Sequence, residues 1–433
     1  MTTATHHIIK KQTLEVCLPS RHNHRAVSEQ VSGLFYREVL PQLSRLFDRL
    51  APPGITFSIG RLSIDLGVLP PGALDRDLSK RFLETAEKAL RELLPEAFAL
   101  GNEPAPKIAT RSREQTLEAA FTAFLETGTM PWWHTIDHFE TFEQALLSLP
   151  PERLVPLIRQ AAAVPRARRR LAMQFSERFF RRLLTLDSRN SGRPAVVLPS
   201  ISIAKKEALL IAAFQDEKEL PEKTNPNEMV AGPTRDREIL PETAPEPHKP
   251  DLNRTNSQSK PPGSSAGSEY YLHNAGLILL WPFLEPFFDA LGLLQDGDFK
   301  DENARQRAVH LTEYLVSGRS NAKEYELTLN KLLCGHPLEE PLISHVRLRK
   351  TEKRESEQLL LEVIGHWAAL GDIDPAALQE SFLQRDGKLL RQGGNWRLQV
   401  EQKAYDMLLG SLPWGVGMVK LGWGEGVVYV EWS

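Results

Sequence analysis

The sequence Pro241-Glu242-Thr243-Ala244-Pro245-Glu246-Pro247-His248-Lys249-Pro250 lies near the middle of the chain and decides how the chain is organised. It belongs to a longer segment, residues 215–268, that contains no Phe, Trp or Tyr and has prolines at positions 221, 226, 233, 241, 245, 247, 250, 261 and 262. A segment of this composition buries too little apolar surface to offset the entropy lost when its backbone is ordered. We therefore expect residues 215–268 to form a flexible Pro-rich linker between two halves of the chain.

The part of the chain directly before this linker, residues 108–214, has a wholly helical pattern. Apolar residues recur at helical spacing and are interrupted by short polar or proline-bearing joints. The expected helices are Arg113–Thr127, Phe139–Leu149, Pro151–Val164, Ala167–Leu186 and Ser200–Phe214.

The first hundred residues alternate between strand and helix patterns. Runs with period two predict strands with one buried face, and runs with helical period predict amphipathic helices. The expected order is a strand over Ile8–Leu18, a helix from Arg25 capped by Asn23 and kinked or divided at Pro41, strands over 55–59 and 62–66, and a helix over Leu74–Leu94. Residues 1–100 are thus predicted to form a β-α-β-α unit.

After the linker, residues 269–433 are predicted to form an α+β domain. The expected helices are Leu272–Leu291, Glu302–Ser317, Ala322–Leu333, Thr351–Leu370 and Pro375–Gln384. Trp396, Leu398 and Val400 then alternate with polar residues, and the β-rich runs 416–421 and 427–432 follow. A small β-sheet should close this domain. The predicted fold class of the whole chain is α+β, mainly α.

The composition is that of an ordinary folded protein. The 433 residues include 53 basic and 56 acidic side chains, giving a net charge of −3. This balance argues against a general nucleic-acid or membrane-surface binder, which needs a basic excess. Cys17 and Cys334 provide no disulfide framework, so a reducing compartment is expected. Neither a secretory signal nor a transmembrane stretch is expected from the hydropathy pattern.

The sequence contains no recognisable catalytic or metal-binding motif. His134 and His138 are four residues apart, but a zinc site needs further ligands, and loop or surface histidines are the simpler interpretation. No Gly-x-Ser-x-Gly turn and no phosphate-binding Gly-x-x-x-x-Gly-Lys-Ser/Thr loop is present. The glycines at 422, 424 and 426 fit a hairpin better than a phosphate loop. We therefore expect no catalytic, cofactor-binding or metal-binding residues.

One run of the chain is strongly basic and is the first candidate for binding a partner. It comprises Arg166, Arg168, Arg169, Arg170, Arg178, Arg181 and Arg182, which on a helix form a stripe beside an apolar face. A solvated helix face with i, i+4 ion pairs is one interpretation. The other is a surface for an acidic protein partner, favoured over nucleic acid because base stacking requires exposed aromatic side chains.

Most of the tryptophans follow the predicted linker, at 281, 367, 396, 414, 423 and 432. Their large area suits a core. Because Trp is also enriched at binding hot spots, Trp414 and Trp423 are further candidates for partner contacts.

Two regions of the sequence carry a family resemblance. The first runs from His7-Ile8-Ile9 to Arg61–Gly67 (RLSIDLG). The second consists of Asn274–Leu284 (NAGLILLWPFL), Arg307–Leu311 (RAVHL), Leu329–Gly335 (LNKLLCG), Phe382–Leu389 (FLQRDGKL), Trp396–Glu401 (WRLQVE), Leu412–Trp414 (LPW) and Val430–Trp432 (VEW). With these motifs in this order, the chain resembles the contractile injection system tape measure protein family.

The resemblance implies a non-enzymatic structural component of a phage-tail-like particle, assembled in the cytoplasm or retained in the finished particle. Its partners would be other particle proteins: the baseplate or spike, and the inner tube or its cap. It would act as a tape measure that sets tube length, or as a baseplate/tube adaptor. The linker favours the adaptor, since its ~54 residues span at most about 180 Å when extended. An assembly chaperone or cargo-binding module is the alternative, and an enzyme of unrecognised type would need a cleft with convergent titratable groups.

Overall fold

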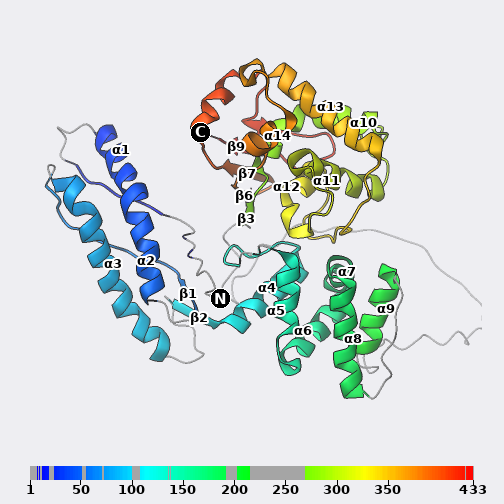
Figure 1. The fold of residues 1–433 in the computed structure, drawn as a ribbon, viewed down its shortest axis with the longest axis horizontal. Helices are drawn as coiled ribbons and strands as arrows, with labels where there is room; N and C mark the ends of the chain where they lie inside the picture. The colour runs from blue at the N-terminus through cyan, green and yellow to red at the C-terminus, as the bar shows by residue number, and fades with distance from the viewer. Residues whose placement is uncertain are drawn as a thin grey trace, which may run out of the picture.

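The computed structural model describes residues 7, 9, 12–18, 24–50, 55–70, 73–99, 108–134, 136, 138–191, 202–214, 269–424 and 426–432. Figure 1 shows the N-terminal helices, a central helical group and a C-terminal group of helices around a small sheet. The predicted linker lies outside the described residues. Mainly helical structure with a β-sheet near the C-terminus confirms the predicted fold class.

A long helical rod forms the N-terminal unit, defined here as the described residues up to 99. α1 (His24–Leu34), the π-helical turn η1 (Phe35–Val39) and α2 (Leu40–Leu50) follow one another without a break, and α3 (Leu74–Ala99) packs along them. The Leu40 amide donates to the carbonyl of Phe35, five residues earlier. Pro41 has no amide hydrogen, and its ring clashes with the carbonyl four residues before it. The kink or division expected at Pro41 is therefore a π-helical turn inside a continuous helix.

Two of the predicted N-terminal strands are wrong. Within 8–18, the described residues 9 and 12–18 form no strand, and neither do residues 62–66. The period-two pattern of 62–66 has another cause, because Leu62, Ile64 and Leu66 pack against the helices' small cores. The strand that does form, β1 (Ile55–Ile59), pairs antiparallel with β2 (Ile108–Ser112), which the sequence analysis missed.

The helical region, defined as the described residues 113–214, surrounds one core of aromatic and aliphatic side chains. Its helices are α4 (Arg113–Thr127), α5 (Phe139–Leu147), α6 (Pro151–Ala163), α7 (Pro165–Gln174), α8 (Glu177–Ser191) and α9 (Ile203–Phe214). α4 begins with a capping box between Ser112 and Gln115 and ends at Gly128, whose φ is +78°.

The helix predicted over Ala167–Leu186 is in fact two helices, α7 and α8. Phe175 has extended backbone angles, and the Ser176 hydroxyl accepts a hydrogen bond from the Phe179 amide. Glu143 accepts from both the amide and the hydroxyl of Ser176, each at 2.6 Å. Ser176 thus caps a new helix, which turns α8 away from α7.

The C-terminal unit, defined as the described residues 269–432, packs helices against one face of a five-stranded sheet. The strand order is β3-β6-β7-β9-β8, and β7 and β9 are parallel while the other neighbours are antiparallel. The strands are β3 (Glu269–Leu272), β6 (Gly387–Gln392), β7 (Asn395–Val400), β8 (Met418–Val419) and β9 (Val428–Glu431), and a separate hairpin joins β4 (Leu294–Gln295) to β5 (Asp298–Phe299). Trp396, Leu398 and Val400 of β7 are buried in the core, in keeping with their alternation with polar residues.

The helices of this unit are more broken than the sequence pattern predicts. They are η4 (Ala275–Leu280), α10 (Trp281–Ala290), α11 (Glu302–Ser317), η5 (Glu324–Glu326), α12 (Thr328–Leu333), α13 (Lys350–His366), η6 (Ala368–Leu370), α14 (Pro375–Leu378), the π-helical η7 (Gln379–Leu383) and η8 (Ala404–Ser411). The single helix predicted over Leu272–Leu291 is therefore wrong: strand β3 and a 3-10 helix precede α10. Pro282 lies in the first turn of α10, where its missing amide hydrogen costs nothing.

His310 on α11 is a buried base inside the C-terminal core. It is 1% exposed, and its Nε2 lies 2.7 Å from the carbonyl oxygen of Ile343. Burial lowers the pKa of the imidazole to about 4, because the charged form would lose its hydration. The folded C-terminal unit therefore holds His310 neutral.

We expect the stability of the C-terminal unit to fall as the pH drops from 6.5 towards 4. In this window the unfolded chain binds a proton at His310 that the folded chain does not bind. The contribution is fully present above the unfolded pKa, and its loss approaches roughly 3 kcal/mol below the folded one. Urea unfolding followed by tryptophan fluorescence would measure the slope. His310→Gln, which keeps a donor for Ile343, should flatten it, and an unchanged slope would assign the effect to another group.

Candidate functional site

The structure divides the predicted arginine stripe between two helices with different surroundings. Arg166, Arg168, Arg169 and Arg170 lie on α7, which faces the C-terminal unit, whereas Arg178, Arg181 and Arg182 lie on the exposed side of α8. One continuous solvated stripe is therefore not formed, because the break at Phe175 and Ser176 reorients the chain.

Arg170 is completely buried between the helical region and the C-terminal unit. Its Nε lies 3.0 Å from a carboxylate oxygen of Glu324, and both side chains are 0% exposed. The guanidinium also donates to the carbonyl of Leu125 at the end of α4, and to that of Glu339 at 2.6 Å. The prediction that Arg170 is part of an exposed stripe is therefore wrong, because its N–H groups donate to acceptors of the same chain.

Glu324 is shared between two buried cations. Its second oxygen lies 2.6 Å from Nζ of Lys331, which also donates to the carbonyls of Leu338 and Glu340. Burial lowers the pKa of Lys331, while the neighbouring Glu324 raises it. The carboxylate and the carbonyl oxygens together compensate two cations that would be costly to bury alone.

A second set of hydrogen bonds joins α7 to the same part of the C-terminal unit. The side-chain Nε2 of Gln174 donates to the backbone carbonyl of Leu342 at 2.6 Å. The side-chain Oε1 of Gln174 accepts from the backbone N–H of Glu324 at 3.2 Å. Lys323 donates to the Gln174 carbonyl at 2.8 Å. At the edge, Arg166 pairs with Glu340 at 2.6 Å.

Aromatic packing completes this contact. Tyr325 of the C-terminal unit packs against the core of the helical region, stacked on Phe139 with ring centroids 6.0 Å apart and edge-on to Phe124 at 6.3 Å. The ammonium of Lys323 lies 4.7 Å from the Phe139 ring centroid. We call this set of contacts the clasp: Arg170 and Gln174 of α7 with Lys323, Glu324, Tyr325 and Lys331 of the C-terminal unit.

Gly128 leaves the space that the clasp needs. A Cβ at this position would lie 2.4 Å from an oxygen of Glu324 and 3.1 Å from an Arg170 nitrogen. The same glycine ends α4 with a positive φ, which L side chains rarely adopt. Helix termination and the approach of the two units thus depend on one residue without a side chain.

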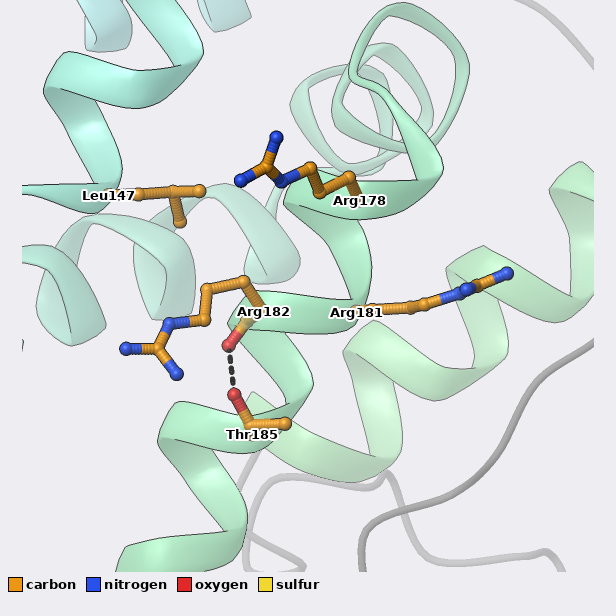
Figure 2. Close-up of a pocket in the computed structure, with 5 residues that line it drawn as sticks. All are labelled: Leu147, Arg178, Arg181, Arg182 and Thr185. Atoms are coloured by element: carbon orange, nitrogen blue, oxygen red, sulfur yellow. Dashed lines mark hydrogen bonds between the residues drawn. The ribbon is translucent and has the colours of Figure 1, made fainter.

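The α8 arginines line a shallow surface pocket of about 350 Å³ together with Leu147 and Thr185. Figure 2 shows Arg178 and Arg182 extending to the side where Leu147 lies, while Arg181 points the other way. Arg181 pairs with Glu177 on its own helix at 3.2 Å. Among the described residues, neither Arg178 nor Arg182 has an ion-pair partner. These two arginines are the members of the predicted stripe that combine a position in this pocket with the lack of a described ion-pair partner.

The remaining predicted site residues are exposed or belong to the core. Arg169 is exposed, and no described carboxylate pairs with it. Trp423 is 9% exposed and donates its indole N–H to the Leu333 carbonyl at 2.9 Å. Trp414 is half-buried, donates to the Leu279 carbonyl at 3.0 Å and packs edge-on against Phe283. Both tryptophans use their polar N–H groups within the C-terminal unit.

The described residues offer no candidate metal centre. Groups of three or more His, Cys, Asp or Glu side chains that could hold a metal ion are absent from this part of the chain. His134 packs against the ring of Phe142, and burial lowers its pKa. Of the helices that the structure describes, none has the length and apolarity needed to cross a membrane.

The family comparison covers nearly the whole chain. The model of the contractile injection system tape measure protein family matches residues 6–432. The chain belongs to this family. No curated protein and no solved structure shows significant similarity to it. It is therefore a tape measure component of a contractile injection system, a class of structural proteins.

Several family motifs have structural roles in this tape measure protein. Gly67 and Gly335 both have φ of +62°, a backbone conformation that turns the chain and that residues with a Cβ rarely adopt. Arg385, within Phe382–Leu389, is buried, pairs with Asp406 and lies over the Tyr405 and Trp432 rings. This arrangement fixes the C-terminal strand against the rest of the unit.

Sequence reasoning missed the C-terminal half of the clasp. Glu324, Tyr325 and Lys331 come from a stretch interpreted as one amphipathic helix. One signal was available: Lys331 lies among the leucines at 329, 332 and 333, and a buried lysine needs a carboxylate or several carbonyls nearby. The identity of the partner could not be read, since Arg170 is 154 residues from Glu324.

Proposed function

We propose that this tape measure protein acts as a non-enzymatic adaptor, which joins the baseplate or spike to the inner tube or its cap during particle assembly. Membership of the family supports the particle role. The clasp is the observation that supports the adaptor in particular, because it closes the helical region against the C-terminal unit. A chain closed in this way presents folded surfaces to its partners. A ruler that spans the tube would have to give up these contacts.

Setting the length of the inner tube is the second candidate function, and it is favoured by the family to which the chain belongs. In that role the segment between Phe214 and Glu269 would extend along the tube. Its ~54 residues reach at most about 180 Å.

Deleting or duplicating residues 219–262 is expected to leave particle length unchanged, because an adaptor does not measure with this segment. Electron microscopy of particles assembled with each variant would test this. Deletion of the whole protein should prevent assembly. A tube length that changes in proportion to the segment would establish the ruler instead. Normal particles without the protein would refute both roles.

A chaperone or cargo-binding role would use the Arg178 and Arg182 pocket, since these two cations lack carboxylate partners in the described chain. Acidic side chains of a particle protein fit this site.

Reversing both charges, Arg178→Glu with Arg182→Glu, is expected to weaken co-purification of an acidic particle protein about tenfold or more, because attraction becomes repulsion. Tube length should not change. The control is Lys350→Glu with Arg354→Glu, an exposed basic pair at the same spacing on α13. Equal effects of the two double variants would show that only net charge matters.

A further inference from the structure

We propose that the C-terminal unit docks on the α7 face of the helical region and stays bound there even when no covalent connection joins the two units. The segment between Phe214 and Glu269 then closes a loop on one rigid unit and does not set the distance between its two ends. This inference concerns the isolated chain and does not depend on the role in the particle.

The first argument is that the clasp resembles a specific protein–protein interface. A buried arginine donates to three acceptors that belong to two different units, Glu324, Glu339 and Leu125. Charged, fully desolvated groups that pair across a contact fix one orientation, because any shift leaves a buried charge without its partner.

The second argument is that the C-terminal unit places an aromatic side chain against the core of the helical region. Tyr325 packs on the core of the helical region, although it belongs to the C-terminal unit. Burial raises the pKa of its phenol, which agrees with its position between Phe124 and Phe139. An aromatic anchor in a pocket of the partner is typical of the centre of a stable interface.

The third argument concerns the length of the connection. The entropic cost of closing a flexible loop grows only logarithmically with its length, so the contact can tolerate large changes between residues 215 and 268. Non-covalent contacts, which are many and buried, hold the two units together whatever that length is.

The test is cleavage of the connection in the purified full chain. A site for a specific protease is inserted between Glu242 and Pro247, and the cleaved protein is examined by gel filtration with light scattering. We expect both fragments to elute together with the mass of one intact chain. Separate elution of the wild-type fragments would overturn the proposal. A complex with the mass of two chains would refute the closed loop, since the units would then pair between copies.

Matched variants identify the surface. Tyr325→Ala and Arg170→Met are each expected to raise the dissociation constant of the fragments at least tenfold. Tyr429→Ala, an exposed tyrosine of β9, and Arg181→Met, an exposed arginine of α8, should leave it unchanged. Circular dichroism of each fragment checks that the variants are folded. Equal affinities for the clasp variants and their controls would show that another surface holds the fragments.

Discussion

Gly276→Ala is expected to prevent stable folding of the C-terminal unit. A Cβ at this position would lie 1.7 Å from the carbonyl oxygen of Phe382 and 2.7 Å from the Cα of Leu383. Both contacts are with backbone, so no side-chain rotation can relieve them. The substitution should cost on the order of 4 kcal/mol or more, because the added methyl group overlaps backbone atoms that cannot move aside without forcing the core apart. Urea unfolding followed by tryptophan fluorescence would measure the change.

Gly365→Ala serves as the control for this prediction. Gly365 is an exposed residue near the end of α13, and nothing lies within 4 Å of a Cβ there. The change should be neutral or stabilise the helix by up to about 1 kcal/mol. Normal stability of the Gly276→Ala protein would mean that η4 and η7 do not approach each other as closely as described.

Glu324→Gln is expected to open the clasp and to destabilise the contact between the two units by about 3–5 kcal/mol. The amide removes the charge that compensates both Arg170 and Lys331, and leaves two cations buried beside a neutral group. Hydrogen exchange of the intact chain would detect the opening as faster amide exchange in α7 and α12, and limited proteolysis would detect it as faster cleavage.

Glu285→Gln is the matched control, because Glu285 is an exposed carboxylate on α10. It should change stability by less than about 0.5 kcal/mol. If Glu324→Gln behaves like this control, the charge of Glu324 does not stabilise the contact between the two units.

The helical region shows how far a sequence pattern can predict structure. α4 was predicted to the residue, since its capping box and C-terminal glycine are local signals. The division between α7 and α8 was not predicted, because the hydrogen bonds to Ser176 come from Glu143, 33 residues earlier. The same limit applies to residues 62–66, whose alternating pattern is satisfied by packing on helices.

The candidate site divides along the same line. The sequence identified the basic run that extends from α7 into the first half of α8, since such a run is visible without a structure. It could not distinguish Arg170, which is buried in the clasp, from Arg178 and Arg182, which line an open pocket. Burial depends on which surface lies opposite, and Glu324 and Tyr325 come from beyond the predicted linker.

By itself, the sequence determined the mainly helical class, the closing sheet and the family, because periodicity, capping residues and ordered motifs are local properties of the chain. Only the tertiary structure decided which charges are free and which are paired inside the molecule. It also decided that the helical region and the C-terminal unit hold each other. The physical reason is that a buried ion pair such as Arg170 and Glu324 is stable only where distant segments jointly exclude water and supply every remaining hydrogen bond.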